Sequence, residues 1–250
     1  MDAEVFLTYS NVSDADVRGR TVVVIDVLRA CSTIVTALSR GARAVLPVPD
    51  MAEAGKIAAN LDPEVYRLGG ERNGAKIEGY HLGNSPHEYT RDEVEDRDVI
   101  LNTTNGTRAL AHAKEAEHLV AACFLNAGRV VDFVQNTTDA VTIICAGRQN
   151  RLALEDTLCA GLILDRLWTG DRPDQVTDSA HTAFTLYDTD RDHLADALRG
   201  ANHAEELAEQ GQDDDLEYCF RLDKCPILPY YTENRLLRLD EDLSPQESSA

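Results

Sequence analysis

The sequence is poor in basic residues and has very little lysine. Its 250 residues include 44 Asp and Glu against 24 Lys and Arg, a formal net charge of −20, and only four of the bases are lysine. Proteins that bind nucleic acid draw much of their affinity from basic surfaces, so this composition argues against a nucleic-acid partner. A charge far from zero keeps a protein soluble at high salt. Two interpretations stay open, a halophilic source or an ordinary acidic cytosolic protein.

The sequence also lacks the patterns of a zinc site, a disulfide framework and a membrane segment. Its six cysteines form no CxxC pair, and its seven histidines show neither HxH nor HExxH spacing. No apolar run approaches the ~20 residues that span a bilayer, and Met1–Glu4 has no positive charge of the kind that opens a signal peptide. We therefore expect reduced cysteines, no membrane partner and a soluble, cytoplasmic protein.

Short apolar runs alternate with amphipathic segments, which is the pattern of an α/β fold. The apolar runs predict strands near Val5–Tyr9, Thr21–Val27, Ala44–Val48, Val65–Leu68, Val99–Leu101, His118–Ala121, Ala140–Cys145 and Ile227–Tyr230. The amphipathic segments predict helices near Ser32–Arg40, Met51–Asn60, Gly106–Lys114, Ala127–Gln135, Leu152–Trp168, Asp178–Tyr187 and Asp192–Leu198. Asp50 and Asn126 are suited to cap helix N-termini, and Gly41 and Gly170 to follow helix C-termini.

The length fits one α/β domain, which we place at 1–243, followed by a polar, frayed tail at 244–250. Val22–Asp26 and Val141–Cys145 are similar apolar runs, and each is followed by a predicted helix. Two similar halves, about 1–115 and 116–243, are therefore an open alternative. Ordinary α/β proteins produce the same resemblance.

A small polar turn follows one of the predicted strands. Val99–Leu101 leads into Asn102–Thr107, and a helix is predicted from Gly106. A strand that ends at a glycine-containing turn before a helix gathers backbone N–H groups and hydroxyls at one point, which is a geometry that binds anions. The same design recurs twice elsewhere in the chain. The sequence thus predicts an enzyme that acts on a small, highly anionic molecule.

Two further segments place charged residues after a predicted strand or in a glycine-rich loop. Asp26 follows four apolar residues at the end of a predicted parallel strand, where it can bind Mg²⁺, attack phosphorus, or only cap the next helix. Arg29 offers a fork for phosphate or sulfonate, the alternative being a surface ion pair. Glu71 and Arg72, in a glycine-rich loop, combine a potential metal ligand with an anion clamp.

Three other segments admit a plain interpretation beside a functional one. Leu82–Pro86 offers an amide and a hydroxyl but is also an ordinary turn. Glu155 and Asp156 begin a long helix, where the helix dipole favours them, yet they could complete a Mg²⁺ site. Cys145 and Arg151 have the Cys-x5-Arg spacing of cysteine-dependent phosphatases. Their loop lacks the required glycines and a following Ser or Thr, so we do not assign Cys145 as a nucleophile.

Taken together, six ordered motifs resemble the 2-phosphosulfolactate phosphatase family. They are Asp26–Ala30, Gly70–Arg72, Leu82–Pro86, Thr103–Thr107, Cys145–Gly147 and Leu154–Thr157, and the similarity extends over roughly residues 20–165 and more weakly to about 230. The resemblance implies a three-layer α/β/α fold with two similar, intertwined halves. It also implies Mg²⁺-dependent hydrolysis of 2-phospho-3-sulfolactate to 3-sulfolactate and phosphate, a step that serves coenzyme M synthesis in methanogens.

The resemblance assigns a role to each candidate residue. The Mg²⁺ ligands would be Asp26, Glu71, Glu155 and Asp156, with Asp26 and Asp156 catalytic. The phosphate and sulfonate would be held by Arg29, Arg72, Asn84, Ser85, Thr103, Thr104, Asn105, Gly106 and Thr107. Either water, with help from the metal, or Asp26 itself would attack phosphorus. A non-catalytic sensor of a phosphorylated or sulfonated metabolite is the alternative function, and a homodimer is expected.

The chain departs from the family pattern in three places. The family commonly has Gly-Glu-Arg-Gly-Gly at Gly70–Gly74 and Ala-Thr-Thr-Thr at Ala30–Thr33, where this chain has Asn73, Cys31 and Ser32. A usual Ser-x-His-Gly-Arg is replaced by Ala201–Glu205. If that last segment reaches the site, the loss of its basic residue would alter the choice of substrate.

Overall fold

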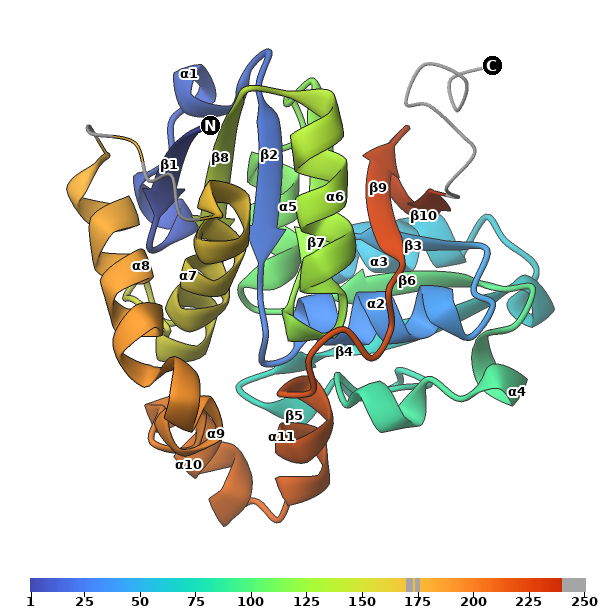
Figure 1. Cartoon of the computed structure of the whole chain (residues 1–250). Coiled ribbons are helices and arrows are strands. Elements are labelled where there is room, and N and C mark those ends of the chain that lie inside the picture. Colours follow the sequence, from blue (N-terminus) through green and yellow to red (C-terminus); the bar gives the residue numbers. More distant parts are fainter. Residues whose placement is uncertain (170–172, 174–175, 240–250) are drawn as a thin grey trace.

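The computed structural model describes residues 1–169, 173 and 176–239. Within them, ten strands form one sheet in the order β1-β8-β2-β7-β9-β10-β3-β6-β4-β5 (Figure 1). The strands are β1 (Asp2–Phe6), β2 (Thr21–Ile25), β3 (Ala44–Pro47), β4 (Tyr66–Arg72), β5 (Ala75–Lys76), β6 (Asp98–Asn102), β7 (His118–Ala122), β8 (Ala140–Cys145), β9 (Leu228–Thr232) and β10 (Arg235–Leu239).

Helices cover both faces of this sheet. The α-helices are α1 (Asp14–Val17), α2 (Ala30–Ser39), α3 (Met51–Ala58), α4 (Arg91–Val94), α5 (Gly106–His112), α6 (Ala127–Thr137), α7 (Leu154–Trp168), α8 (Asp178–Asp190), α9 (Leu194–Arg199), α10 (Asn202–Glu209) and α11 (Asp213–Cys219). In Figure 1, α6 and α7 lie in front of β2, β7 and β8, and α5 lies behind β2. The fold is therefore the expected three-layer α/β/α arrangement.

The sheet consists of two parallel lobes joined by a hairpin. Strands β1, β8, β2 and β7, here the β2 lobe, pair in parallel, as do β3, β6 and β4 of the β6 lobe, to which β5 adds an antiparallel edge. The antiparallel hairpin β9–β10 connects them through Val120–Tyr230 on one side and Leu236–Val45 on the other. Because β1 and β2 pair with β8 and β7, the β2 lobe combines two separate parts of the chain, whereas the strands of the β6 lobe all come from residues 44–102.

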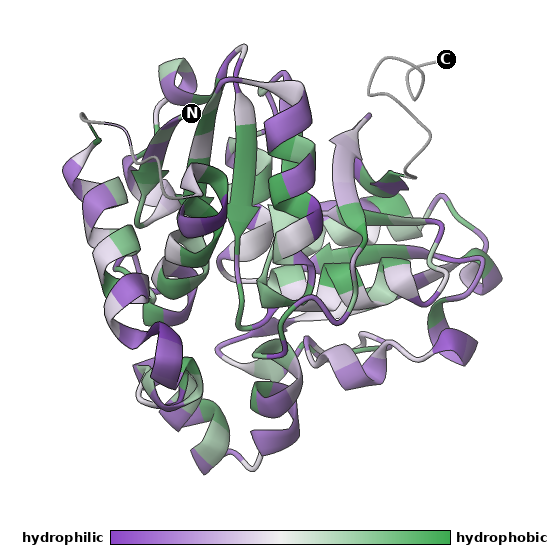
Figure 2. Ribbon diagram, viewed as in Figure 1, coloured by the Kyte–Doolittle hydropathy of each residue, from purple (hydrophilic) through white to green (hydrophobic). Residues whose placement is uncertain are grey.

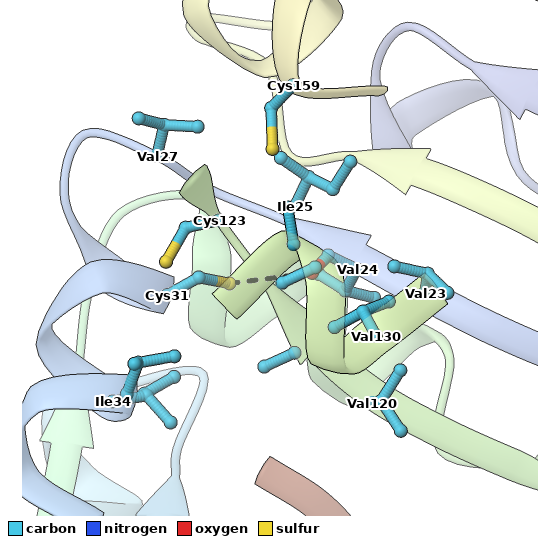
Figure 3. Close-up of a cluster of buried hydrophobic side chains, with 14 of the residues drawn as sticks. Val23, Val24, Ile25, Val27, Cys31, Ile34, Val120, Cys123, Val130 and Cys159 are labelled. Carbon is cyan, nitrogen blue, oxygen red and sulfur yellow. Dashed lines mark hydrogen bonds between the residues drawn. The ribbon is translucent and has the colours of Figure 1, made fainter. Parts of the chain in front are cut away.

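The core of the β2 lobe explains why its strands read as unbroken apolar runs. All five residues of β2 are buried, since helices cover both faces of a parallel sheet. Figure 2 shows hydrophobic central strands and hydrophilic outward helix faces. Cys31, Cys123 and Cys159 pack around Val24 and Ile25 as small apolar side chains, and the Cys31 thiol donates to the Val24 carbonyl at 3.5 Å (Figure 3). All six cysteines are free, as expected.

The predicted helix caps have different outcomes. The Asp50 carboxylate accepts the Glu53 N–H, and Gly41 follows α2 with a φ of +98°, so both predictions are confirmed. Asn126 occupies the N-cap position of α6, but its amide does not cap the helix. Instead it accepts the Cys123 N–H and donates to the Ala121 and Ile227 carbonyls. Gly170 and the predicted tail at 244–250 lie outside the described residues.

Several element boundaries differ from the prediction. Strand β1 begins and ends three residues earlier than the predicted Val5–Tyr9, and Tyr9–Asn11 forms a 3-10 turn. Strands β5 and β10 and helices α1, α4, α10 and α11 were not predicted, because they are short or predominantly polar. Strand β8 has the predicted bounds, and the other predicted strands and helices are present with one or both ends shifted. None of the helices in the described part of the chain has the length and apolar character needed to cross a membrane.

Candidate active site

A cavity of about 310 Å³ lies where the two lobes meet, beyond the carboxyl ends of β2, β4, β6 and β8. In Figure 1 the arrow of β2 points toward α10 and α11, and α10 contributes to the lining. Open α/β sheets place ligands at this edge. The lining comprises Tyr9, Asp26, Leu28, Arg29, Glu71, Asn73, Gly74, Asn84, Thr103, Thr104, Asn105, Arg108, Arg148, Gln149, Asn150, His203, Glu206, Leu207 and Gln210. We call it the strand-edge cavity.

Asp26 is the buried carboxylate that follows β2. Its Oδ1 accepts the N–H of Ala30 at 2.9 Å, so it caps α2 as one interpretation predicted, while the same residue lines the cavity. Its Oδ2 faces Gly106, where a Cβ would lie only 2.6 Å from that oxygen. Among the described residues no hydrogen bond engages Oδ2. The polar turn after β6 can approach Asp26 this closely because it has glycine at that position.

Burial raises the pKa of Asp26 from 3.8 to about 6. The hydrogen bond from Ala30 and the nearby His203 lower the pKa, and the carboxylates of Glu155 and Glu71 raise it further. A carboxylate in this setting is costly to ionise without a compensating charge. A divalent cation at the cavity would provide that compensation and restore its negative charge.

Glu71 ties the β4–β5 hairpin to the turn after β6. Its Oε1 accepts the N–H of Thr104 at 2.7 Å, and its Oε2 accepts the N–H of Gly74 at 2.9 Å. Within the turn, the hydroxyls of Thr103 and Thr107 each accept the other residue's N–H at 3.1 Å. Thr107 lies behind the lining and holds the turn, whereas Thr103, Thr104 and Asn105 face the cavity.

Two buried polar atoms in the cavity wall have no partner. The Asn84 Oδ1 and the Thr104 hydroxyl make no hydrogen bond within the described residues, although both are shielded from solvent. Buried polar atoms are nearly always paired in folded proteins. Both residues line the strand-edge cavity, so these oxygens are suited to bind a ligand there. Both were among the predicted site residues.

Arg29 lines the cavity but already has a charged partner. Its Nη1 donates to the carboxylate of Asp215, within α11, and to the side-chain oxygen of Gln212, which precedes that helix. The ion pair is buried, with both side chains 5% exposed. It is therefore not the surface pair considered from the sequence. Ser85 donates to the other oxygen of Asp215 at 2.6 Å and lies outside the lining.

Arg72 does not share the cavity with Glu71. Its Nη2 donates to Asn102 Oδ1 at 2.7 Å, and its Nη1 donates to the Glu71 carbonyl. Successive side chains of a strand point to opposite faces, so Glu71 and Arg72, at the end of β4, are directed apart. Only Glu71 is part of the cavity lining.

The two carboxylates that open α7 lie behind the strand-edge cavity. Asp156 accepts the Val27 N–H at 2.8 Å and the Gly147 N–H at 3.1 Å, joining the ends of β2 and β8 to α7. Burial raises its pKa, as do Asp26 and Glu155. Glu155 contacts His203 Nδ1 at 3.3 Å and lines a neighbouring cavity of about 580 Å³.

Two arginines that line the cavity, Arg108 and Arg148, were not among the site residues predicted from the sequence. Arg148, after β8, pairs with Glu206 of α10, with 2.6 Å from Nη1 to Oε1 and a second contact from Nη2 to Oε2. Arg108 makes no ion pair with any described residue. Both arginines had a signal, since each directly extends a polar turn at a strand end. The 201–205 segment does reach the site, because His203 lines the cavity; Glu205 lines the neighbouring one.

Cys145 is unsuited to be a nucleophile, as the sequence indicated. It is fully buried, and burial raises the pKa of its thiol well above the ordinary value, with Asp156 and Glu155 adding to the effect. Arg148 and Arg151 exchange backbone hydrogen bonds across a tight turn. The chain between Cys145 and Arg151 therefore turns back on itself and does not form a phosphate loop around the thiol.

The oxygen atoms at the cavity fit a hard cation with few protein ligands. Across the described ranges no group of three or more His, Cys, Asp or Glu side chains is arranged to hold a metal ion. Mg²⁺ commonly binds through one or two carboxylates and keeps several waters. Asp26 Oδ2, Asn84 Oδ1 and the Thr104 hydroxyl belong to lining residues and have no hydrogen-bond partner among the described residues, and this donor set suits Mg²⁺.

Comparisons with known proteins match the chain to one family. Residues 6–234 match the family model described as 2-phosphosulpholactate phosphatase. A protein of Caldanaerobacter subterraneus is 36% identical over 242 residues, covering 97% of this chain and all of that protein. One of Symbiobacterium thermophilum is 40% identical, covering 90% and 97% of the two chains, and one of Pseudothermotoga lettingae 45%, covering 86% and 91%. All three are named probable 2-phosphosulfolactate phosphatase.

Proposed function

The chain belongs to the 2-phosphosulfolactate phosphatase family, and from that premise we propose that it is a Mg²⁺-dependent phosphatase of small, highly anionic phosphate monoesters. The substrate we favour is 2-phospho-3-sulfolactate, which would give 3-sulfolactate and phosphate. The family resemblance noted from six motifs is confirmed, and with it the class of phosphoric monoester hydrolases.

One observation carries the proposal. The strand-edge cavity combines the carboxylate of Asp26 with two buried oxygens that lack partners, on Asn84 and Thr104. A receptor built only for anions gains nothing from a buried carboxylate whose ionisation burial opposes. A site for a cation together with a phosphate accounts for both features, since the cation offsets the charges of the carboxylate and of the ester.

The residues of the chain have the following roles in this proposal. Asp26 Oδ2, with Asn84 and Thr104, would hold Mg²⁺, which neutralises the charge that develops on the phosphoryl group. Arg108 would bind phosphate oxygens, being a cavity arginine with no carboxylate partner among the described residues. Glu71 keeps the turn after β6 against the β4–β5 hairpin. The attacking group is either water or Asp26 itself, which lines the same cavity.

Of the four carboxylates that the sequence predicted as Mg²⁺ ligands, this proposal keeps only Asp26. Glu71 faces the cavity, but both its oxygens accept backbone N–H groups. Asp156 holds two N–H groups behind the cavity, and Glu155 faces His203. We therefore assign them to positioning, with Asp156 fixing the strand end on which Asp26 stands.

The test is phosphate release from 2-phosphosulfolactate and from phospholactate, with Mg²⁺ and with EDTA, at high and low salt. Metal-dependent release with a preference for the sulfonate supports the reaction and the substrate together. Tight binding without release from any ester would instead favour a non-catalytic metabolite sensor. Trapping with hydroxylamine during turnover separates the two nucleophiles, since it captures an aspartyl phosphate but leaves no adduct when water attacks.

A further inference from the structure

The arginines of the strand-edge cavity differ in how firmly their present partners hold them. Arg29 is paired with Asp215 in a buried setting, with both side chains 5% exposed. Arg148 is paired with Glu206 at the solvent side, where the two side chains are 27% and 47% exposed. Arg108 has no carboxylate partner among the described residues. A substrate with several negative groups can thus recruit these three cations at very different cost.

The two ion pairs differ in how easily an incoming anion can separate them. Removing the partner from a buried pair leaves an uncompensated charge and is strongly unfavourable. A half-exposed pair such as Arg148–Glu206 contributes little, because water solvates either group once they separate. An anionic group of the substrate can therefore take Arg148 from Glu206, whereas Arg29 stays with Asp215.

Glu206 holds Arg148 in the way a substrate would. Both of its oxygens contact different nitrogens of the guanidinium, the two-pronged geometry that a ligand carboxylate or sulfonate also adopts. The charge of Arg148 lowers the pKa of Glu206, mainly through this hydrogen bond, so the carboxylate is ionised and competes fully. Glu206 also lines the neighbouring cavity of about 580 Å³, which gives a displaced side chain room to move into.

We propose that Glu206 occupies, in the free enzyme, the subsite on Arg148 that binds the second anionic group of the substrate, and that this group displaces it. The proposal rests on the proposed function for the phosphate end of the substrate. It makes Glu206 a specificity-determining residue, because it weakens the binding of every ester that uses Arg148. It leaves esters without a second anion unaffected.

The test compares the wild-type enzyme with Glu206→Gln on three esters. These are 2-phosphosulfolactate, with a sulfonate and a carboxylate, phospholactate, with a carboxylate alone, and ethyl phosphate, with neither. We expect KM to fall about two- to fivefold for the first two esters and to stay the same for ethyl phosphate. The effect should fall on KM and not on kcat. A larger effect with the sulfonate than with the carboxylate identifies the group that binds Arg148.

A matched control separates competition from general electrostatics. Glu205→Gln removes the same charge from the adjacent residue of α10, which lines only the neighbouring cavity. We expect no such KM change in this variant. Arg148→Lys keeps the charge but loses the two-pronged contact, and it should raise KM for the two esters that have an anionic group besides the phosphate. If Glu206→Gln folds poorly, Glu206→Ala tests the same point.

Calorimetry with 3-sulfolactate and with inorganic phosphate tests the proposal without turnover. Glu206→Gln should bind 3-sulfolactate about two- to fivefold more tightly and phosphate as the wild type does. This result would stand even if the wild type hydrolysed none of the esters, so the two proposals fail separately. Unchanged 3-sulfolactate binding, or an equal gain in Glu205→Gln, would overturn the role of Glu206.

Discussion

Replacing Asp26 by Asn should abolish phosphate release and at the same time stabilise the fold. The amide oxygen of Asn can still accept the Ala30 N–H, so the cap of α2 is kept. The variant removes a buried group whose ionisation burial opposes, raising its pKa from 3.8 to about 6. At ~1.4 kcal/mol for each tenfold change in proton affinity, this corresponds to about 3 kcal/mol at most.

The stability gained by Asp26→Asn depends on pH. Between about pH 3.8 and 6 the folded wild-type protein binds more protons at Asp26 than the unfolded chain does, so its stability falls as pH rises through this range. The Asn variant binds no proton there. Its advantage over the wild type should therefore be full at pH 7.5 and roughly half as large at pH 5.

Thermal and denaturant unfolding at these two pH values, in EDTA, measures the effect without a cation to offset the charge. For a chain of this size about 3 kcal/mol corresponds to a rise in Tm of roughly 6–12 °C. Asp50→Asn is the matched control, because Asp50 also caps a helix but is exposed; we expect its stability to change by less than about 0.5 kcal/mol. An Asp26→Asn protein no more stable than the wild type at pH 7.5 would refute the reasoning. Near-normal turnover would remove Asp26 from catalysis.

Three other predictions concern the same cavity. Chelation of Mg²⁺ should abolish phosphate release, and added Mg²⁺ should raise the Tm of the wild type more than that of Asp26→Asn; equal Tm shifts would place the metal elsewhere. Gly106→Ala should lose most of its activity and stability, since its Cβ would lie 2.5 Å from that of Ala30, whereas Gly55→Ala, with open space around it, should fold and turn over normally. Arg108→Gln should raise KM about tenfold or more for every phosphate ester, ethyl phosphate included, because it removes a charged hydrogen bond to phosphate; an unchanged KM would remove it from the site.

The sequence predicted best the strands whose bounds are set by the burial of apolar side chains. Strand β8 begins and ends where its apolar run does, at Ala140 and Cys145, because both faces of the strand are buried. Helices α10 and α11 were missed because their sequences are mostly polar, and only tertiary contacts such as Arg29–Asp215 place them. A local pattern contains no information about such long-range partners.

The same limit applies to the site. Asp26 and Thr104 were found because each follows a predicted strand, and Asn84 because its turn is one of the motifs that resemble the family; the structure brings all three to one cavity. Arg72 was expected there, although the alternation of side chains along β4 already directs it away from Glu71. The pairing of Arg148 with Glu206 joins residues far apart in the chain, and no spacing rule predicts it.

The order of strands in the β2 lobe has a consequence for synthesis on the ribosome. β1 and β2 are made early, but both pair with β8, which begins only at Ala140. The strands β3, β4 and β6 are complete much sooner, by Asn102. The emerging polypeptide therefore exposes the apolar strand β2, which leads to Asp26, while the parallel strands of the β6 lobe can already pair with one another. Such an unpaired strand is a natural target for chaperones and the segment most prone to aggregate before the chain is finished.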